Sequence, residues 1–542
     1  MRNLKRALSL GLTAAMISGL MVMGSSAASY ADVTSENNVE AIEVLESVGI
    51  MIGDESGNFN PDQNVTRNEM AVVMSNLMEY NVASYANTSP FTDVPSWAEP
   101  YVAACWTNGI TAGTSATTYG GSDNVTTSQA ALMLMKALGY FQYSQDFGQD
   151  WQLATATKGN DIDLFNGVDS GLREAMTRND LAQLVLNTLE SGTVSASTSG
   201  SITVGGVTIA TDVQYNYVTS NAGYAKSISG ALSTDANSDA GRPIVELGED
   251  LYQGDLAKAK DHDAFGRPAA IWAYKDNEIG TYVDDRTQTW TTKVTERDLY
   301  RAAGTAAVND YEWNYWIDGE RHTMDGSALD RNDTDRWQTT GNGVLTEMFV
   351  DTVAETVDVT VIHTYVAEVS RVEANDDDND YTVTVNLKTR PAGVGVNREF
   401  STEEEFARGD IVVVNIADGN IEAMSLAETV EGTVSAVKDN DYLKIDGNPY
   451  NYNYAYTTDA VLQGYTSDSK GLYDLENSTP ANPGAGDEVI LYLDTNGCLV
   501  AVADAGEVAE DYIYVKGLHQ AYGDYSAKIV KYDGTEETVD RS

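Results

Sequence analysis

The chain has few of the residues that form cross-links, metal sites or catalytic centres. Its 542 residues include only 2 cysteines and 4 histidines. Cys105 lies in a helical pattern and Cys498 in a strand pattern, so we expect neither a disulfide framework nor a cysteine-based metal site. The histidines are scattered and match no zinc or metalloprotease spacing: His262, His322, His363 and His519.

Motifs for other catalytic classes are lacking as well. There is no Gly-x-Ser-x-Gly nucleophile elbow, no phosphate-binding loop and no cysteine–histidine signature. A glycoside hydrolase needs only two carboxylates, and the chain has 82 acidic residues, but acidic content alone does not indicate such an enzyme. We therefore expect a protein that is not an enzyme.

Basic residues are scarce relative to acidic ones. The chain has 33 Lys and Arg against 82 Asp and Glu, which gives a formal net charge of −49 at pH 7. Charge of this sign repels nucleic acid and anionic surfaces and attracts divalent cations. Because 42% of the residues are apolar and 31 are tyrosines, we expect folded domains rather than disorder.

One acidic turn is a candidate calcium site. Four carboxylates and one amide follow one another there, in Asp376-Asp377-Asp378-Asn379-Asp380. These are the hard oxygen ligands that Ca²⁺ prefers, although the glycine and the final glutamate of an EF-hand are missing. The candidate ligands are Asp376, Asp378 and Asp380, and the alternative is a solvated acidic turn without a metal.

Long apolar runs are also lacking, except at the N-terminus. Basic residues precede an apolar run over residues 7–24, and small residues follow it up to Ala31. This pattern predicts a secretory signal peptide over residues 1–31, with cleavage after Ala31 or after Ala28. No later run is long enough to span a bilayer, so we expect an exported chain without membrane insertion.

The most informative stretches are three helix starts. A Thr followed three residues later by Glu, Gln or Asp opens three helix-period apolar runs, at Thr66-Arg67-Asn68-Glu69, Thr126-Thr127-Ser128-Gln129 and Thr177-Arg178-Asn179-Asp180. The pattern predicts capping boxes, which Asp180 is too short to complete well. Arg67 and Arg178 add a cation beside unpaired helix amides, so these corners suit an anion. The alternative is that each motif is a helix cap alone.

The helix starts belong to repeated units of about 60 residues. Glycine-bounded turns, Gly49-Ile50-Met51-Ile52-Gly53 and Gly109-Ile110-Thr111-Ala112-Gly113, end 13 residues before the first two capped helices. A helical pattern precedes each turn, and repeats of this kind stack to complete one another's cores. We place the units at residues 32–85, 86–140 and 141–190. The third is degenerate, because Asp163-Leu164-Phe165-Asn166-Gly167 replaces its glycine turn.

Several motifs of these units resemble the S-layer homology repeats of bacterial surface proteins. They are Phe91-Thr92-Asp93-Val94-Pro95, Trp97-Ala98, the Gly-Ile-x-x-Gly turn, Phe59-x-Pro61 and Thr-Arg-x-Glu. The resemblance implies a pseudo-threefold helical prism whose grooves hold a pyruvylated secondary cell-wall polysaccharide. It also implies six groove residues, which are Arg67, Arg178, Trp97, Asp93, Gly49 and Gly109.

The implied groove residues have different expected roles. An Arg at a helix start could bind a ketal-linked pyruvate carboxylate in bidentate fashion. Gly49 and Gly109 would permit close backbone approach. For the ring of Trp97 we expect a place in the core, and for Asp93 the alternative is to fix the start of its repeat by hydrogen bonding.

The units depart from the family pattern in three places. The second unit has Thr127 in place of Arg and Gln129 in place of Glu. The first unit has Asn37-Asn38 where Trp-Ala is expected, and the third lacks the Gly-Ile turn. We therefore expect at most two intact anion sites.

Beyond the repeats the apolar pattern changes from the helical to the strand period. Residues 191–201 predict a flexible linker, and residues 202–340 a mixed, mostly β domain with a short helix near residues 296–303. Alternation over residues 357–361 and 381–387, and of the tyrosines between positions 450 and 456, predicts half-buried antiparallel strands. We place β modules at residues 341–404, 405–485 and 486–542, the last short enough to be truncated.

The predicted fold class is multidomain α+β: an all-α three-repeat pseudo-trimer followed by mostly antiparallel, sandwich- or barrel-like β modules. The predicted function is that of a cell-wall-anchored structural surface protein, of the S-layer or S-layer-like type. Its repeats would bind an anionic wall polysaccharide, and its β modules would face outward and associate with other copies. An adhesin or glycan-binding protein on the same anchor is one alternative, and an anchored glycoside hydrolase is another.

Overall fold

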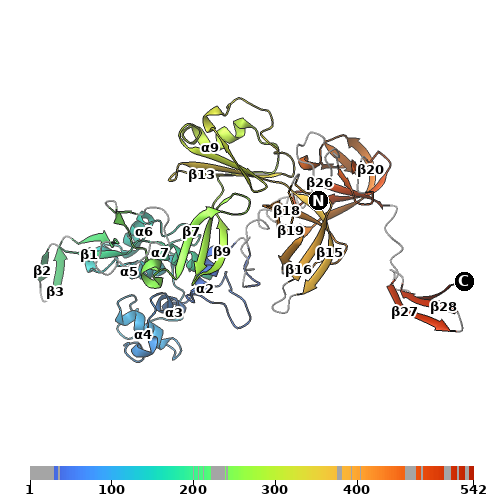
Figure 1. Ribbon diagram of the computed structural model, residues 1–542. Helices are drawn as coiled ribbons and strands as arrows, with labels where there is room; N and C mark the ends of the chain where they lie inside the picture. Colours follow the sequence, from blue (N-terminus) through green and yellow to red (C-terminus); the bar gives the residue numbers. More distant parts are fainter. Residues whose placement is uncertain are drawn as a thin grey trace. The chain divides into compact units, whose positions relative to one another are not determined.

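The computed structural model describes residues 30–34, 37–198, 200–204, 207–211, 213–220, 238–239, 242–374, 381–391, 394–402, 404–457, 472–477, 480–481, 483–505, 514–521, 524–530 and 536–541. These residues form two compact units (Figure 1). The first holds the described residues up to Asp263 and then Arg267–Asp284. The second holds Ala264–Gly266 and the described residues from Asp285 onward.

The first unit begins with three helix pairs, one in each predicted repeat. The pairs are α2 (Val39–Ser47) with α3 (Arg67–Leu77), α4 (Glu99–Thr107) with α5 (Thr127–Ala137), and α6 (Trp151–Asp161) with α7 (Arg178–Leu189). Single 3₁₀ turns, η1 (Val82–Tyr85) and η2 (Ser144–Phe147), lie between the pairs. The three predicted helix starts are therefore confirmed.

The caps differ in the way that their residues predict. At α3 the amide of Glu69 donates to Thr66 Oγ1 over 3.3 Å, and the Glu69 carboxylate accepts from the Thr66 amide over 2.7 Å. At α7 the amide of Asp180 donates to Thr177 Oγ1 over 3.1 Å. The short Asp180 side chain instead accepts from the amide of Ser170, 2.9 Å away.

A closed ring of backbone hydrogen bonds joins the three repeats just before their second helices. The amide of Val65 donates to Met176 O over 2.9 Å, that of Met176 to Val125 O over 3.0 Å, and that of Val125 to Val65 O over 2.9 Å. Each repeat thus donates one bond and accepts one. The ring gives the helical part its pseudo-threefold arrangement.

The turn after the first helix is the same in all three repeats. Gly49 and Gly109 adopt φ values of 75° and 74°, and Asp163 adopts 54° at the corresponding position of the third repeat. The next residue donates its amide five residues back, from Ile50 to Leu45 O and from Leu164 to Gly159 O. The expectation that the third repeat lacks this turn is wrong, because aspartate tolerates the left-handed conformation better than most residues do.

The described part of the predicted flexible linker, residues 191–201, is held in place by strand pairing and by a hydrogen bond to the repeats. Strand β1 (Val194–Ser197) pairs with β4 (Gln214–Tyr217), and the Val194 amide donates to Leu138 O of the repeats over 2.8 Å. Further short strands pair as β2 with β3 and β5 with β6, at Gly200–Val204, Val207–Thr211, Ser238–Asp239 and Arg242–Pro243.

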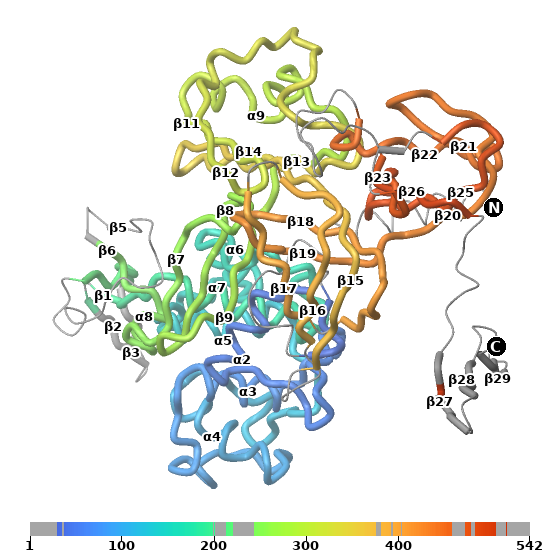
Figure 2. Tube along the Cα trace, turned by 45° about the vertical axis from the view of Figure 1, so that its right-hand side comes forward, coloured from blue at the N-terminus to red at the C-terminus, as the bar shows by residue number. Residues whose placement is uncertain are grey.

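A small sheet completes the core of the helical repeats. It consists of β7 (Leu256–His262), β8 (Pro268–Tyr274) and β9 (Asn277–Val283), preceded by α8 (Leu247–Tyr252). Trp272 and Tyr282 are buried in the same apolar cluster as the repeat helices, and β9 lies beside α2 (Figure 2). The structure thus divides the predicted 202–340 domain, because its first part shares a core with the repeats.

The second unit opens with a helix packed on a five-stranded sheet. The elements are β10 (Gln288–Trp290), α9 (Glu296–Asp310), β11 (Glu312–Ile317), β12 (Glu320–Met324), β13 (Leu345–Asp351) and β14 (Thr356–Ile362). The strand order is β10-β13-β14-β11-β12, with β11 and β14 parallel. Helix α9 begins at the predicted residue and breaks at Gly304 (φ 82°, ψ 164°), directly after the predicted end, and a second helical segment continues to Asp310. Strand β14 is central and buried on both faces, including Asp358 and Thr360, rather than half-buried as predicted.

Two further sheets and a three-stranded meander follow. The first sheet has the order β17-β16-β15-β18-β19, with strands at Tyr365–Ala374, Tyr381–Leu387, Glu399–Thr402, Ile411–Ala417 and Asn420–Leu426 for β15 to β19. The second has the order β22-β21-β20-β25-β26-β23-β24, with strands at Glu428–Lys438, Tyr442–Ile445, Asn448–Asn451, Leu472–Asp474, Pro480–Ala481, Glu488–Leu493 and Leu499–Asp504 for β20 to β26. The meander is β27 (Tyr514–Ala521), β28 (Asp524–Val530) and β29 (Glu536–Arg541).

The predicted fold class is confirmed: helical repeats precede mostly antiparallel sheets. The predicted tyrosine strand is wrong in its second half, since β22 ends at Asn451 and Tyr454–Tyr456 form a 3₁₀ turn. The Asn453 side chain starts this turn by accepting from the Ala455 amide over 2.9 Å. A capping Asn thus overrides the strand alternation here.

Candidate functional site

The start of each second helix rests on a loop of another repeat. The first two helix amides of α3, from Arg67 and Asn68, donate to Asp123 O and Gly121 O, each over 2.9 Å. The corresponding amides of α5 and α7 make the same two bonds to the third and first repeats. These amides are therefore already paired, and the expectation that they stand free for an anion is wrong.

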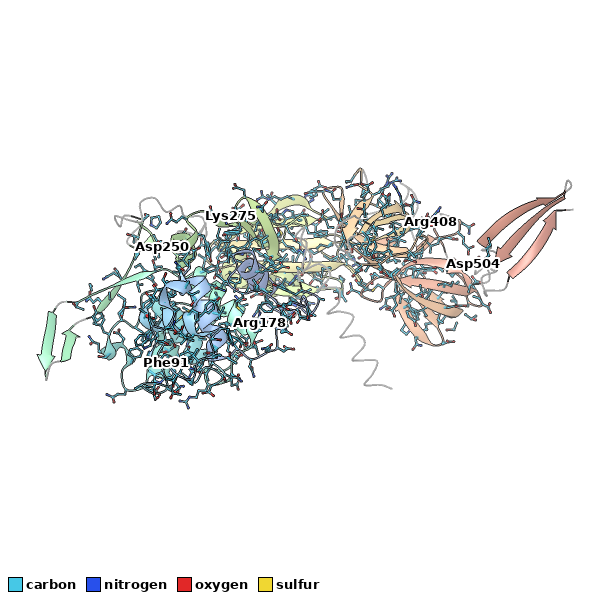
Figure 3. The ribbon with its side chains drawn as sticks, turned by 90° about the horizontal axis from the view of Figure 1, so that it is seen from below. Phe91, Arg178, Asp250, Lys275, Arg408 and Asp504 are labelled. Atoms are coloured by element: carbon cyan, nitrogen blue, oxygen red, sulfur yellow. The ribbon has the colours of Figure 1, made fainter. Side chains whose placement is uncertain are left out.

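Arg67 and Arg178 clamp the same loops with their side chains. Arg178, labelled in Figure 3, donates from Nε to Phe59 O over 2.7 Å and from Nη2 to Ile52 O over 2.9 Å. Its guanidinium carbon lies 4.6 Å from the centroid of the Phe59 ring. Arg67 repeats the arrangement on Tyr119, with the same 4.6 Å separation. Each arginine therefore joins its own repeat to the next.

The third junction lacks both partners of this clamp. Thr127 replaces the arginine at the start of α5, and Ser170 occupies the loop position of the aromatic ring. Thr127 Oγ1 donates to Ser170 O over 3.3 Å. Because the cation and its ring are missing together, the arginine and the aromatic residue act as one structural pair.

Each arginine retains hydrogen-bonding capacity for a ligand. Among the described residues, Nη1 of Arg67 and of Arg178 has no hydrogen-bond partner. Burial lowers the pKa of Arg178, and the neighbouring carboxylates of Glu69, Asp32 and Asp54 oppose that shift. A partly buried guanidinium whose Nη1 has no partner among the described residues can bind a carboxylate or a sugar oxygen.

Asp93 orders its own repeat. Its carboxylate accepts from the amides of Tyr119 and Gly120, each over 2.8 Å, and these two hydrogen bonds lower its pKa. Asp32 makes the same pair of bonds in the first repeat, to the amides of Phe59 and Asn60. The geometry favours the alternative considered for Asp93, in which it fixes the loop.

Trp97 and the two turn glycines lie at the surface. The side chain of Trp97 is 55% exposed, so the expectation of a core position is wrong, and its ring is open to stack on a sugar. Gly49 and Gly109 are required by their left-handed conformation, and a Cβ atom added to either would meet no atom within 4 Å. The space beside them is open to a ligand.

A cleft of about 410 Å³ lies between the first and third repeats. Its lining is polar and acidic, without a basic side chain: Asp32, Thr34, Asn37, Pro61, Asp62, Asp169, Thr177, Asn179 and Asp180. Asn37 belongs to the pair that replaces the expected Trp-Ala. Carboxylate, amide and hydroxyl groups of this kind suit the hydroxyl groups of uncharged sugars, whereas an anion would be repelled. The sequence pattern gives no sign of this cleft, because its two sides lie more than 100 residues apart in the chain.

The calcium prediction rests on an acidic turn that the structure does not describe. Asp376, Asp378 and Asp380 lie outside the described residues. Across the part of the chain that the structure describes, no group of three or more His, Cys, Asp or Glu side chains is arranged to hold a metal ion. Within the same part, none of the helices has the length and apolarity needed to cross a membrane.

Comparison with known proteins confirms the resemblance seen in the repeats. The family model of the S-layer homology domain matches residues 29–71 and 90–131, which fall in the first two repeats. The degenerate third repeat lies outside both matches.

Three relatives show how far the similarity extends. A surface-layer 125 kDa protein of Lysinibacillus sphaericus is 34% identical over 129 residues, covering 23% of this chain and 11% of the relative. A cell surface protein of Thermoanaerobacter kivui is 24% identical over 372 residues, covering 61% of this chain and 47% of the relative. An endoglucanase of Bacillus sp. strain KSM-635 is 29% identical over 116 residues, covering 20% of this chain and 12% of the relative. The chain thus spans less than half the length of each of these relatives.

Proposed function

We propose that this S-layer-like protein of the cell surface is held to the cell wall by its three helical repeats, which bind an anionic wall polysaccharide without a covalent bond. The observation that carries the proposal is the pair of arginines at the starts of α3 and α7. Both are fixed in position by a ring and two carbonyl oxygens, and in both the Nη1 group has no partner within the part of the chain that the structure describes. Preorganised donors of this kind bind an anion at little cost in side-chain entropy.

The polysaccharide would meet different chemistry at different junctions. At the two junctions with an arginine, the free N–H group suits an acidic substituent such as a pyruvyl ketal. The exposed ring of Trp97, in the second repeat, offers a stacking surface. The acidic cleft lies at the same first–third junction as Arg178, where Thr177 and Asn179 line it, and it suits an uncharged sugar. At this junction the arrangement therefore favours a glycan in which an uncharged sugar lies next to a charged unit.

Binding to isolated cell walls tests this proposal. The full mature chain is mixed with purified sacculi, before and after the secondary polysaccharide is removed, and the sedimented fraction is measured. The full chain is needed because β7–β9 share the core of the repeats. We expect binding that is lost on removal of the polysaccharide. No binding to intact sacculi would contradict the proposal.

Variants then test the arginines. Arg67→Ala and Arg178→Ala should each weaken sedimentation at least several-fold. Lys158→Ala removes a cation of the same repeats that pairs with exposed Asp161 over 3.2 Å and lies 5.6 Å from the centroid of the Tyr140 ring, and should bind like the parent chain. Equal binding by all three variants would exclude a role for the arginines as ligands. Thermal unfolding of each variant separates lost binding from lost structure.

The sheets of the second unit are proposed to mediate association between copies of the chain at the surface. The similarity to a surface-layer protein and a cell surface protein supports this part of the proposal. Electron microscopy of the protein, with Ca²⁺ and with a chelator, should show a regular array. Dispersed particles under both conditions would favour the adhesin alternative, and a reducing-sugar assay on a glycan panel would reveal a hydrolase.

A further inference from the structure

Tyr30 is a core residue of the first repeat. Its side chain is 6% exposed, and its ring centroid lies 5.6 Å from that of Phe59. Its hydroxyl oxygen accepts from the Gly53 amide over 2.7 Å. A Cβ atom added to Gly53 would lie 2.1 Å from the Tyr30 ring. Gly53 is therefore glycine because the ring of Tyr30 covers it.

The second repeat contains the same arrangement. The ring of Phe91 lies 5.3 Å from that of Tyr119, and a Cβ atom added to Gly113 would lie 2.3 Å from Phe91. Phe91, labelled in Figure 3, precedes Asp93 by two residues as Tyr30 precedes Asp32. Since Asp93 and Asp32 bind equivalent loop amides, Tyr30-Ala31-Asp32 is the first repeat's copy of Phe91-Thr92-Asp93. The folded repeat thus starts at Tyr30 and not at residue 32.

This start excludes one of the two predicted cleavage sites. Small residues occupy the positions one and three before the cut in both cases, with Ser26 and Ala28 at one site and Ser29 and Ala31 at the other. Cleavage after Ala31 would remove Tyr30 and leave its place over Gly53 and beside Phe59 empty. Cleavage after Ala28 leaves the complete repeat.

We propose that the exported chain is processed at the Ala28–Ser29 peptide bond. Hydrolysis of this bond adds water, giving the carboxylate of Ala28 on the leader and a new amino group on Ser29 of the mature chain. The bond itself lies outside the described residues, and the inference is carried by the contacts of Tyr30. It does not depend on what the repeats bind.

The N-terminus of the secreted protein tests the proposal directly. The full-length precursor is produced in a host that exports it, and the mature protein is examined by intact mass and N-terminal sequencing. We expect Ser29 as the first residue. Any other first residue, Asp32 in particular, would overturn the proposal.

A matched pair of variants tests the site without reference to the fold. Signal peptidases require a small residue just before the cut. Ala28→Leu should therefore leave a precursor of higher mass, whereas Ala31→Leu, at an exposed position, should be processed at the parental bond. The reverse pattern would overturn the proposal.

The physical reason is tested with two purified chains. One begins at Ser29 and the other at Asp32, and their helical unfolding is followed by circular dichroism. The shorter chain should unfold at a clearly lower temperature, because it lacks Tyr30. Equal unfolding temperatures would remove the argument that selects the Ala28 site.

Discussion

The guanidinium of Arg178 lies over the ring of Phe59, 4.6 Å from its centroid, although the two residues belong to different repeats. Arg67 and Tyr119 form the same pair one junction earlier. Both aromatic rings are buried at the repeat boundary. The arginine at each of these helix starts is thus a structural element as well as a candidate ligand.

The first prediction concerns the energy of this pair. In a double-mutant cycle with Arg178→Ala and Phe59→Leu, the coupling free energy should be about 0.5–2 kcal/mol. Either single substitution already breaks the partly desolvated cation–π contact, so the double variant does not lose that contact a second time. Urea unfolding followed by circular dichroism measures it. Fully additive effects of the two substitutions would show that the contact contributes nothing.

The second prediction is that the missing clamp can be restored. Thr127→Arg alone should destabilise the repeats by about 1–3 kcal/mol, since it places a cation at a buried position without its ring. Thr127→Arg combined with Ser170→Phe should recover at least half of that loss. Thermal unfolding of the single and double variants provides the measurement, and Ser170→Phe alone is the control. No recovery in the double variant would contradict the idea of an interchangeable pair.

The third prediction concerns the sheet that shares the core of the repeats. Trp272 is fully buried and donates from Nε1 to Glu40 Oε1 of α2 over 2.6 Å. Trp272→Ala should lower the stability of the helical repeats by about 3–5 kcal/mol, although it lies outside them. The loss should appear in the unfolding transition of the helices.

Trp337→Ala is the matched control for this prediction. Trp337 is also a buried tryptophan, but it belongs to the core of the second unit, where it packs with α9. Its removal should leave the helical transition of the repeats in place. If Trp272→Ala behaves in the same way, β7–β9 do not stabilise the repeats.

The fourth prediction is a pH dependence that arises from α2. Burial raises the pKa of Glu43, whose ordinary value is 4.5, and its carboxylate accepts from the Tyr282 hydroxyl. A carboxyl group with a raised pKa in the folded state stabilises the fold at low pH. That contribution is lost as the pH rises from the ordinary value through the raised one.

Glu43→Gln should remove this pH dependence while keeping an acceptor for Tyr282. The free energy of unfolding of the variant, relative to the parent chain, should therefore increase as the pH rises above the ordinary pKa of 4.5. Urea unfolding at several pH values is the measurement. A difference that stays constant with pH would show that Glu43 does not titrate in this way.

The fifth prediction separates binding from stability at Trp97. Because the side chain is 55% exposed, Trp97→Ala should change the free energy of unfolding by less than about 0.5 kcal/mol. Binding to sacculi should nevertheless weaken, since a stacking surface is lost. Phe at this position should keep most of the binding. Unchanged binding by Trp97→Ala would remove the ring from the proposed site.

The local sequence is sufficient to predict the helix starts and the strand-rich remainder of the chain. Thr66 and Glu69 form a capping box that depends only on residues three apart, so the pattern alone predicts it. The left-handed turn at Asp163 is not predicted by a pattern that requires glycine at this position, although aspartate tolerates the same conformation. An Asx residue directly before a buried leucine is the available signal.

Long-range pairing was beyond the sequence pattern. The apolar run around Trp272 is compatible with a strand, but it does not indicate that this strand will pack beside α2. In the same way, nothing near Arg67 in the chain indicates that Tyr119 will lie beneath its guanidinium. The acidic cleft depends on two segments that only the closed arrangement of repeats brings together.

The ring through Val65, Val125 and Met176 has a consequence for how this region can change over time. The bonds that close it use only main-chain atoms, so side chains around it are free to diverge without opening it. The third repeat lacks the glycine of the turn and the aromatic side chain that an arginine would cover, yet its backbone still completes the hydrogen-bonded ring. Conversely, deletion of any one repeat would leave an unpaired donor and acceptor at the centre. The number of repeats is therefore held at three by geometry, while their sequences can drift.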